Sequence, residues 1–168
     1  MIKVKDLMTT KVIDCAPSDS IRDAARIMYL NGLSGLPVLN KQGKLAGIIT
    51  ERQLVKLEKP LHIPSVIAIL GSMIYLDNPL NGDEIEKQLE LLTATKVEEV
   101  MSKDVITITS EESVENLAEI FLHKNVNPVP VVDGGKLVGI VSRADIVKLL
   151  SGEKDVAKGE WRDLIVKQ

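Results

Sequence analysis

An internal repeat constrains the fold of this chain more than any other feature of its sequence. Residues 43–54 read GKLAGIITERQL and residues 135–146 read GKLVGIVSRADI, a shift of 92 positions (135 − 43). Further upstream, residues 3–28 align with residues 96–121 at a shift of 93 (96 − 3). A shorter turn in the second copy, GG in place of KQG, accounts for the difference. The chain is therefore expected to contain two similar folding units.

Both copies predict the same order of elements, β-α-β-β-α. Each begins with a short β-rich run, at 12–16 and 105–109, followed by a polar, acidic stretch that suits a helix N-terminus. Apolar residues then recur at helical spacing: Ile21, Ala24, Ala25 and Met28, and Val114, Leu117, Ala118 and Phe121. Asn31-Gly32 predicts the end of the first of these helices. Two strands around a tight turn follow, marked by Asp-Gly in the second copy, and a second helix begins after Thr50 and after Ser142. Either unit alone is too short to bury its apolar face, so the two are expected to pack on each other.

The repeats divide the chain into four parts. Repeat 1 spans residues 1–56, a helical connecting segment spans 57–94, repeat 2 spans 95–152 and a tail spans 153–168. The apolar stretch 63–76 is too short to cross a membrane and is expected to form a buried core helix. Residues 82–92 predict an amphipathic helix, which either covers the core or forms a dimer face. The tail carries Trp161 and docks either on its own chain or on a partner.

Composition excludes several classes of partner. A net charge of −3, a pI near 5.5 and only 2% aromatic residues argue against nucleic-acid binding through phosphate neutralisation or base stacking. A single cysteine, Cys15, excludes an internal disulfide and suits a reducing compartment. The first residues, MIKVKDLMTTK, lack the apolar core of a signal peptide. We therefore expect a cytoplasmic protein that binds neither nucleic acid nor a membrane.

No motif in the sequence indicates an enzyme. No pair of histidines stands at zinc-binding spacing, and there is no CxxC, no P-loop and no GxGxxG. Cys15 lies in a β-rich run without an evident base, so a buried thiol is expected rather than a nucleophile. The sequence predicts no catalytic residue, no metal site and no cofactor.

The end of each copy allows two interpretations. Ser142-x-x-Asp145 and Thr50-x-x-Gln53 both resemble a capping box, in which the third helical residue reaches back to the cap. A carboxylate accepts hydrogen bonds only, so Asp145 can also take both donors of a vicinal diol, while the amide of Gln53 cannot. A helix N-terminus also favours an anion. Capping explains both copies, and a ligand site is a further interpretation for the second.

Taken together, these motifs resemble CBS domains, named for cystathionine β-synthase, arranged as a tandem pair or Bateman module. The resemblance rests on DLMT and EVMS early in each copy, on LPV and VPVVD, and on GIITERQ and GIVSRAD before the last helix. It implies an α/β (α+β) fold in which two repeats pack as a pseudo-two-fold pair with two clefts. Members of the family commonly bind adenosine-containing ligands, dimerise into a disk, and regulate an enzyme or transporter.

The resemblance also implies which residues line each cleft. For the first cleft it gives Thr10, Ile13, Leu33, Ser34, Asn127, Pro128, Ile140, Ser142, Arg143 and Asp145. In this cleft Ser142 would contact phosphate and Asp145 the ribose hydroxyls. For a second, weaker cleft it gives Lys103, Ile106, Val126, Ile48, Thr50 and Gln53, together with Ser34 and Gly35. Ile13, Leu33 and Ile140 would equally serve as ordinary core residues.

One departure from the family pattern concerns the phosphate. In the gamma subunits of AMP-sensing kinases, cations stand where this chain has Asn127-Pro128 and Ser34-Gly35. Phosphate would then be met by Ser142, by backbone amides, and by Arg143 or Lys11. This argues against ATP and leaves AMP, ADP or S-adenosylmethionine open.

Two functions follow from the sequence. The first is a stand-alone, homodimeric regulatory module that binds an adenine nucleotide or S-adenosylmethionine and acts on an enzyme or transporter in trans. The second is a structural or protein-interaction module with vestigial clefts.

Overall fold

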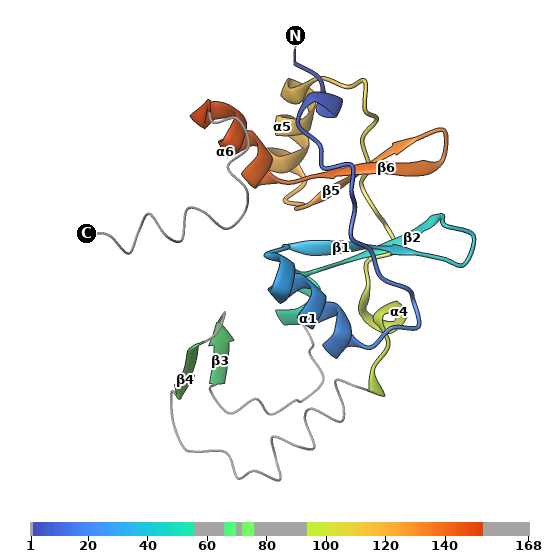
Figure 1. The fold of residues 1–168 in the computed structure, drawn as a ribbon, viewed down its shortest axis with the longest axis vertical. Helices are drawn as coiled ribbons and strands as arrows, with labels where there is room; N and C mark the ends of the chain where they lie inside the picture. Colours follow the sequence, from blue (N-terminus) through green and yellow to red (C-terminus); the bar gives the residue numbers. More distant parts are fainter. Residues whose placement is uncertain (1, 56–65, 70–71, 76–93, 153–168) are drawn as a thin grey trace.

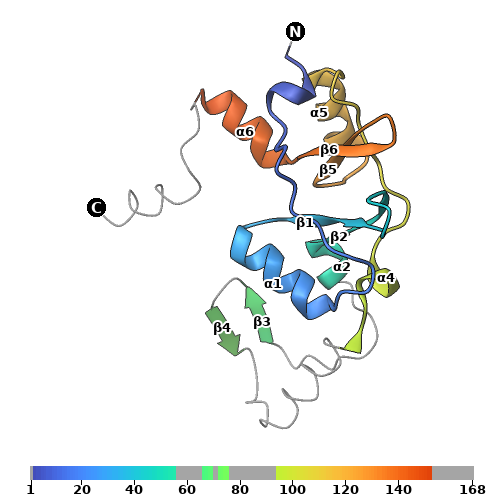
Figure 2. The same cartoon turned by 45° about the vertical axis from the view of Figure 1, so that its right-hand side comes forward.

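The two repeats fold into similar units. The computed structural model describes residues 2–55, 66–69, 72–75 and 94–152. The first unit contains α1 (Ile21–Asn31), β1 (Gly35–Leu39), β2 (Leu45–Thr50) and α2 (Glu51–Val55). The second contains α5 (Val114–His123), β5 (Val129–Asp133), β6 (Lys136–Val141) and α6 (Arg143–Ser151). The two β-hairpins lie at the centre, with α1 on one outer side and α5 on the other (Figures 1 and 2). The expected α+β fold of two tandem repeats is confirmed.

The first helix of each unit begins after a serine cap, slightly later than the acidic stretch in the sequence suggested. Ser20 Oγ accepts a hydrogen bond from Asp23 N at 3.0 Å, and Ser113 Oγ accepts one from Asn116 N at 3.2 Å. Each serine thereby satisfies an amide that has no partner within the helix. Gly32, with a φ of 60°, ends α1 in the left-handed conformation, as predicted.

The predicted inner faces of these helices are the faces that the structure buries. Ile21, Ala24 and Met28 of α1 are buried, as are Leu117 and Phe121 of α5. The other predicted members of each face are half-buried. Full burial of a large apolar side chain contributes about 1.5–3 kcal/mol. These helices are therefore held mainly by their contact with the hairpins.

The second hairpin turns as the sequence predicted. Asp133 pairs with Lys136, and the two residues between them, Gly134 and Gly135, have φ values of 56° and 77°. Positive φ at both central positions is typical of the two-residue turn that matches the twist of a hairpin. The Asp-Gly signal therefore marked the turn correctly.

The β-rich run at the start of each repeat forms a single bridge rather than a full strand. Cys15 N donates to Pro37 O at 3.1 Å, and Leu39 N donates to Cys15 O at 3.0 Å, which makes a parallel bridge to β1. The chain then turns, since Asp19 N donates to Ala16 O at 3.1 Å. The second repeat has the equivalent bridge to β5. The β-rich run predicted at 12–16 and 105–109 therefore contributes one bridge on each side and no full strand.

The first residues of each repeat, before its β-rich run, form a segment that pairs with the other repeat and is called here the exchanged segment. Thr9 and Ile140 exchange backbone hydrogen bonds of 2.9 and 3.0 Å, which joins the first segment to β6. Ser102 and Ile48 exchange bonds of 2.9 and 3.0 Å, which joins the second segment to β2. In Figure 1 the chain starts beside α5, runs past the second hairpin and only then enters the first unit. No motif in the sequence predicted this exchange.

The exchange also reaches the hydrophobic cores. The structure has two clusters of buried residues, one in each unit. Val97, the first residue of α4 (Val97–Val100), belongs to the cluster of the first unit. Val4, the first residue of the 3₁₀ helix η1 (Val4–Asp6), belongs to the cluster of the second. Both valines are completely buried. Each unit therefore depends on the other to complete its core.

The connecting segment contains an antiparallel pair, β3 (Val66–Ile69) and β4 (Ser72–Tyr75), where the sequence predicted a helix. The prediction is wrong for these residues. A short apolar run does not distinguish a helix from a strand by periodicity, and Val, Ile and Tyr favour strands. The predicted helix at 82–92 and the tail around Trp161 lie outside the described residues. Within the described part of the chain, no helix has the length and apolarity needed to cross a membrane.

Candidate functional site

A cavity of about 510 Å³ lies between the two units, beside the start of α6; it is named here the Asp145 cleft. Most residues predicted for the first cleft line it: Ile13, Leu33, Ser34, Asn127, Pro128, Ile140, Ser142 and Asp145. They come from both repeats, because the exchanged segments and the hairpins bring the two ends of the chain together.

The apolar wall of the Asp145 cleft is formed by side chains that the fold leaves partly exposed. Ile13 is 39% exposed, and Leu33 and Ile140 are half-buried. The sequence allowed these three residues to be ordinary core residues. Their exposure instead leaves apolar surface open to the cavity, which suits contact with a flat, apolar face such as that of a purine.

The polar centre of this cleft is the Ser142–Asp145 pair. Ser142 N donates to Asp145 Oδ2 at 2.6 Å, and Ser142 Oγ donates to the same oxygen at 2.8 Å. Within the described residues, Asp145 Oδ1 accepts no hydrogen bond. One oxygen of the carboxylate therefore caps α6, and the other remains available as an acceptor at the cavity.

A chain of hydrogen bonds connects the start of α6 to the first unit. Asn127 Oδ1 accepts from Arg143 N at 2.9 Å, and Asn127 Nδ2 donates to Ser34 Oγ at 3.0 Å. Ser34 and Asn127 are equivalent positions of the two repeats (127 − 34 = 93). Their contact therefore joins residues that the pseudo-two-fold symmetry of the repeats relates to each other. Both residues line both clefts. They form a wall that the two cavities share.

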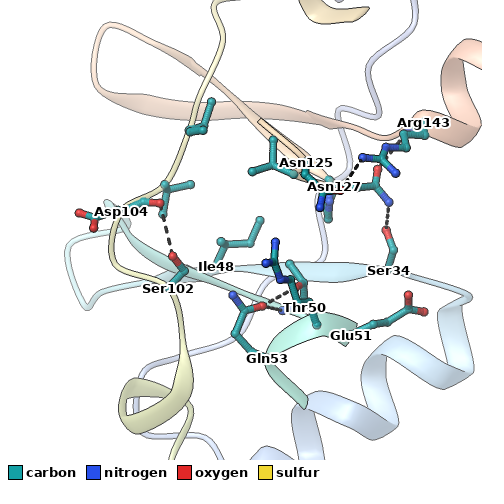
Figure 3. Close-up of a pocket in the computed structure, with 15 residues that line it drawn as sticks. Ser34, Ile48, Thr50, Glu51, Gln53, Ser102, Asp104, Asn125, Asn127 and Arg143 are labelled. Atoms are coloured by element: carbon teal, nitrogen blue, oxygen red, sulfur yellow. Dashed lines mark hydrogen bonds between the residues drawn. The ribbon is translucent and has the colours of Figure 1, made fainter. Parts of the chain in front are cut away.

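The second cavity, named here the Gln53 cleft, has almost the same volume, about 500 Å³ (Figure 3). Ile48, Thr50, Gln53, Ile106 and Val126 line it, as predicted. Gln53 Oε1 accepts hydrogen bonds from Thr50 N, at 3.1 Å, and from Thr50 Oγ1. The only acceptor of the Gln53 side chain is thus already used in the cap. The two clefts differ in their polar centre rather than in their size.

Four predicted residues do not line the clefts to which they were assigned: Thr10, Lys103, Gly35 and Arg143. Thr9, Lys11 and Ile13 line the Asp145 cleft instead of Thr10. Successive side chains of an extended segment point to opposite sides. The sequence identified the correct segment as part of the cleft, but the residue chosen from it points away from the cavity. In the same way, Ser102 and Asp104 line the Gln53 cleft instead of Lys103. Gly35 lines the Asp145 cleft rather than the Gln53 cleft.

Arg143 was predicted for the Asp145 cleft and lines the Gln53 cleft instead. Its Nη2 donates to Phe121 O at 3.1 Å and to Asn125 Oδ1 at 3.3 Å, so the guanidinium is held at the end of α5. Figure 3 shows the side chain turned toward Asn125 and Asn127. The structure therefore places the guanidinium outside the Asp145 cleft, where the C-terminus of α5 attracts the cation.

Several residues of the Asp145 cleft were missed in the sequence. Lys148 lines the cleft, and its position three residues after Asp145 places it on the same side of α6. That spacing was a signal that could have been used. Glu51, the first residue of α2, lines both clefts. No motif indicated that Glu51 lies at the clefts, because only the folded arrangement brings α2 next to the wall that the two clefts share.

Outside the clefts, Cys15 is buried, as predicted, with 3% of its surface exposed. Burial away from water raises the pKa of its thiol to about 12, with Asp19 and Asp14 adding to the effect. Such a thiol stays protonated and unreactive at neutral pH. In the described ranges, no group of three or more His, Cys, Asp or Glu residues could hold a metal ion.

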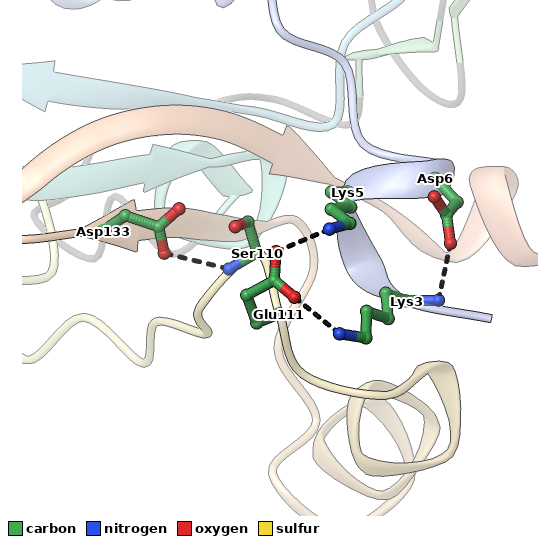
Figure 4. A network of polar contacts seen from close by, with 6 residues as sticks. All are labelled: Lys3, Lys5, Asp6, Ser110, Glu111 and Asp133. Atoms are coloured by element: carbon green, nitrogen blue, oxygen red, sulfur yellow. Dashed lines mark hydrogen bonds and ion pairs between the residues drawn. The ribbon is translucent and has the colours of Figure 1, made fainter. Parts of the chain in front are cut away.

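The first exchanged segment is also held by charge. Lys3 Nζ and Lys5 Nζ each lie 2.6 Å from a different oxygen of Glu111, the residue that precedes α5 by a short turn (Figure 4). The hydrogen bonds from Lys3 and Lys5 hold the pKa of Glu111 at about 2, and the bond to Glu111 raises the pKa of Lys5. Nearby, Ser110 donates to Asp133 Oδ1 at 3.0 Å and lowers the pKa of that carboxyl. The side chains of Lys3, Lys5 and Glu111 lie on the surface, so their ion pairs stabilise the fold only modestly.

Comparison with known proteins identifies the family. The sequence model of the CBS domain matches residues 4–59 and 97–152. The chain belongs to the CBS domain family. A relative from Methanocaldococcus jannaschii, the uncharacterized protein MJ1426, is 34% identical over 154 residues, with 88% of this chain and 90% of the relative covered.

Solved structures of CBS domain proteins share the fold. The CBS domain pair of protein MJ0100, in complex with 5′-methylthioadenosine and S-adenosyl-L-methionine, is 27% identical, with a TM-score of 0.64 and coverage of 92% of this chain and 99% of that one. The CBS domain of a CBS-domain-containing membrane protein from Sphaerobacter thermophilus is 27% identical, with a TM-score of 0.69 and coverage of 89% and 88%. The tandem pair is therefore the shared architecture.

Proposed function

We propose that this CBS pair is a cytoplasmic regulatory module, without catalytic activity of its own, that binds an adenosine-containing ligand in the Asp145 cleft. The observation that carries the proposal is the unused acceptor, Asp145 Oδ1, at the edge of an open cavity. A carboxylate oxygen accepts hydrogen bonds from hydroxyl groups, and hydrogen bonds to a charged acceptor contribute about 1.5–3 kcal/mol. The ribose of a nucleoside offers two adjacent hydroxyls that match this acceptor.

The walls of the cleft support the same class of ligand. Ile13, Leu33 and Ile140 offer partly exposed apolar surface for a purine. A cavity of about 510 Å³ lies within the range of about 300–1,000 Å³ that is typical of small-molecule sites. The related CBS pair of MJ0100, which was solved with 5′-methylthioadenosine and S-adenosyl-L-methionine, supports an adenosyl group as the common element.

The Gln53 cleft lacks the feature that supports binding in the Asp145 cleft. Gln53 has one acceptor oxygen, and Thr50 N and Oγ1 both donate to it. Its remaining polar group is the amide NH2, which can only donate. A ribose that lies beside Thr50 and Gln53 would therefore meet no carboxylate at the position that Asp145 occupies in the other cleft. We therefore propose one adenosyl ligand per chain.

The proposal includes a homodimer that acts on an enzyme or transporter in trans. Large apolar side chains are exposed at equivalent positions of the two units: Tyr29 and Leu122 on the first helices, and Val55 and Val147 on the second. Exposed apolar side chains at matching positions of both units support an interface between copies of the chain. Light scattering should give the mass of a dimer at micromolar concentration and physiological salt, and a monomer would contradict this part of the proposal.

A thermal-shift experiment tests the function. Wild type and Asp145→Asn are heated alone and with AMP, ADP, ATP, S-adenosylmethionine or NADH. A ligand at 100 times its Kd should stabilise wild type by about 2.7 kcal/mol. Both capping donors use a single oxygen of Asp145, so the one oxygen of asparagine can keep the cap while the second acceptor is lost. Asp145→Asn should therefore melt close to wild type without ligand but gain little from it. If none of these ligands raises the melting temperature of wild type, a structural module with vestigial clefts would be favoured instead.

A further inference from the structure

The exposed face of the first helix carries opposite charges in the two units. Arg22 and Arg26 of α1 are exposed and lie one turn apart on the same side of the helix; they are called here the basic stripe. The equivalent positions of α5 hold Glu115 and Glu119, which are also exposed and are called here the acidic stripe (115 − 22 = 93 and 119 − 26 = 93). The outer faces of the two units are therefore complementary in charge.

Each stripe lies beside an exposed apolar side chain. Tyr29, which is 56% exposed, follows Arg26 by three residues and lies on the same side of α1. Leu122, which is 75% exposed, follows Glu119 in the same way and also lines a cavity of about 450 Å³ between α5 and α6. Apolar side chains bordered by charged ones are typical of a surface that a protein partner covers.

The arginines of the basic stripe are unpaired in the described part of the chain. Neither Arg22 nor Arg26 forms a hydrogen bond or an ion pair within residues 2–55, 66–69, 72–75 and 94–152. Asp23 is the remaining charged residue of α1, and its Oδ2 accepts from Ser20 Oγ at 2.7 Å. The arginine donors are therefore not used by the carboxylate nearest to them in the sequence.

The glutamates of the acidic stripe make only local contacts on α5. Hydrogen bonds from its own amide and from Ser113 lower the pKa of Glu115, so this carboxylate is charged at neutral pH. Glu119 Oε2 lies 2.8 Å from Nε2 of His123, one turn further along the helix. A carboxylate has two oxygens that accept several hydrogen bonds, so both glutamates can also accept from an arginine.

The charges beyond the stripes do not cancel this difference. Lys124 follows α5, and Arg143 donates to Phe121 O, so two cations lie at the C-terminal end of α5. The equivalent positions in the first unit hold uncharged Asn31 and anionic Glu51 (124 − 31 = 93 and 143 − 51 = 92). Where both units carry a charge at these equivalent positions, the signs are again opposite.

We propose that two copies of the chain dimerise in an antiparallel arrangement, with α1 of one copy against α5 of its partner, and that the two stripes select this orientation. The proposal rests on the homodimer of the proposed function and specifies its arrangement. A two-fold axis repeats each contact, so both copies present their arginines to the glutamates of the other. In a parallel dimer, α1 would face α1 and α5 would face α5, and like charges would repel at both contacts.

Charge reversal on one helix distinguishes the two orientations. Sedimentation equilibrium at low ionic strength gives the dimer Kd of wild type, of Arg22→Glu/Arg26→Glu, and of the fourfold variant that adds Glu115→Arg/Glu119→Arg. The double variant should raise the Kd at least about tenfold, because glutamates then face glutamates at both contacts. The fourfold variant should return the Kd to within about threefold of wild type. Added salt should narrow the difference between wild type and the double variant, since salt screens exposed charges.

The matched control is Lys41→Glu/Lys44→Glu, which makes the same change of charge in the exposed turn between β1 and β2. An equal loss in this control would overturn the proposal, because net charge alone would then explain the effect. An unchanged Kd in Arg22→Glu/Arg26→Glu, or a loss that the fourfold variant does not restore, would overturn it and leave the homodimer standing. A monomeric wild type would refute the homodimer, and this proposal would fall with it.

Cross-linking gives the orientation without any change in the stripes. A short bismaleimide should join Tyr29→Cys to Leu122→Cys when the two variants are mixed, and should join few dimers of either variant alone. The native Cys15 is buried and should not react. Efficient cross-linking within each variant alone would indicate the parallel dimer and overturn the proposal.

Discussion

Replacing Gly47 by alanine should destabilise the protein more than replacing Gly139, although the two glycines occupy equivalent positions of the repeat. In both places the exchanged segment of the other unit crosses the strand. A Cβ at Gly139 would lie 2.5 Å from Met8 Sδ and 3.0 Å from Met8 Cγ. A Cβ at Gly47 would lie 2.5 Å from Met101 Sδ and, in addition, 2.9 Å from Ser102 O.

The difference lies in what has to move. A methionine side chain is flexible and can turn away from a new methyl group at modest cost. Ser102 O is fixed, because Ser102 and Ile48 exchange the two backbone hydrogen bonds that join the units. Overpacking costs about 1–3 kcal/mol, and the loss of unfolded-state freedom on replacing glycine returns about 0.4–1 kcal/mol. We expect a loss of about 1 kcal/mol for Gly139→Ala and about 2–3 kcal/mol for Gly47→Ala.

Equilibrium unfolding in urea measures both values, with the protein concentration held constant so that any dimerisation affects the variants equally. Gly139→Ala serves as the matched control, since it has the same side-chain contact without the backbone contact. The free energy of unfolding should be lower for Gly47→Ala than for Gly139→Ala by about 1–2 kcal/mol. Equal losses, or a larger loss for Gly139→Ala, would refute the reasoning that paired backbone bonds fix the second exchanged segment.

Three further predictions concern single side chains. Lys3 and Lys5 hold the pKa of Glu111 at about 2, below its ordinary value of 4.5, so their contact stabilises the fold above pH 4.5 and this stabilisation is lost as the pH falls from 4.5 to 2. In Glu111→Gln, the free energy of unfolding, measured by circular dichroism, should fall less steeply between pH 4.5 and pH 2 than in wild type. The same pH dependence in both proteins would contradict the ion pairs of Glu111 with Lys3 and Lys5. Cys15, with a pKa of about 12, should resist iodoacetamide in the folded protein and react after unfolding, whereas rapid labelling of the native state would show that it is not buried. Gln53→Glu supplies the second acceptor that the Gln53 cleft lacks, so calorimetry should detect a second, weaker binding event; a single unchanged event would show that another feature disables this cleft.

The sequence predicted the local structure of the repeats well, because helix and hairpin signals are local. Gly32 ends α1 and Asp133-Gly134 marks the second hairpin, both as the sequence predicted. The pairing of each exchanged segment with the other repeat was not predicted, although the sequence contains a sign of it. Val4 and Val97 stand at equivalent positions near the start of each repeat, but periodicity does not show which unit a short segment contacts. The pair β3 and β4 was taken for a helix because a short apolar run has no decisive period.

The candidate site was predicted at the level of segments and corrected at the level of side chains. Ser142 and Asp145 were predicted from their spacing of three residues at the start of a helix. This spacing lets one oxygen of Asp145 accept the capping hydrogen bonds from Ser142 and leaves the other oxygen as an acceptor. Thr10 was chosen over its neighbours because the sequence does not reveal which side of an extended segment faces a cavity. Arg143 was misplaced because its partner, the C-terminus of α5, comes from a distant part of the chain. Lys148 was recognised only once the course of α6 was known.

The central claim is that the Asp145 carboxylate is the acceptor for the ribose of an adenosyl ligand. Titration calorimetry with AMP on wild type, Asp145→Asn and Gln53→Ala tests it most directly. The account predicts one site per chain in wild type, a loss of about ten- to a hundredfold in affinity for Asp145→Asn, and wild-type affinity for Gln53→Ala. Unfolding of the same samples without ligand should show that Asp145→Asn loses no more than about 1 kcal/mol, since the cap is kept. Two equal sites per chain, or unchanged affinity in Asp145→Asn, would contradict the claim and leave Asp145 as a helix cap only.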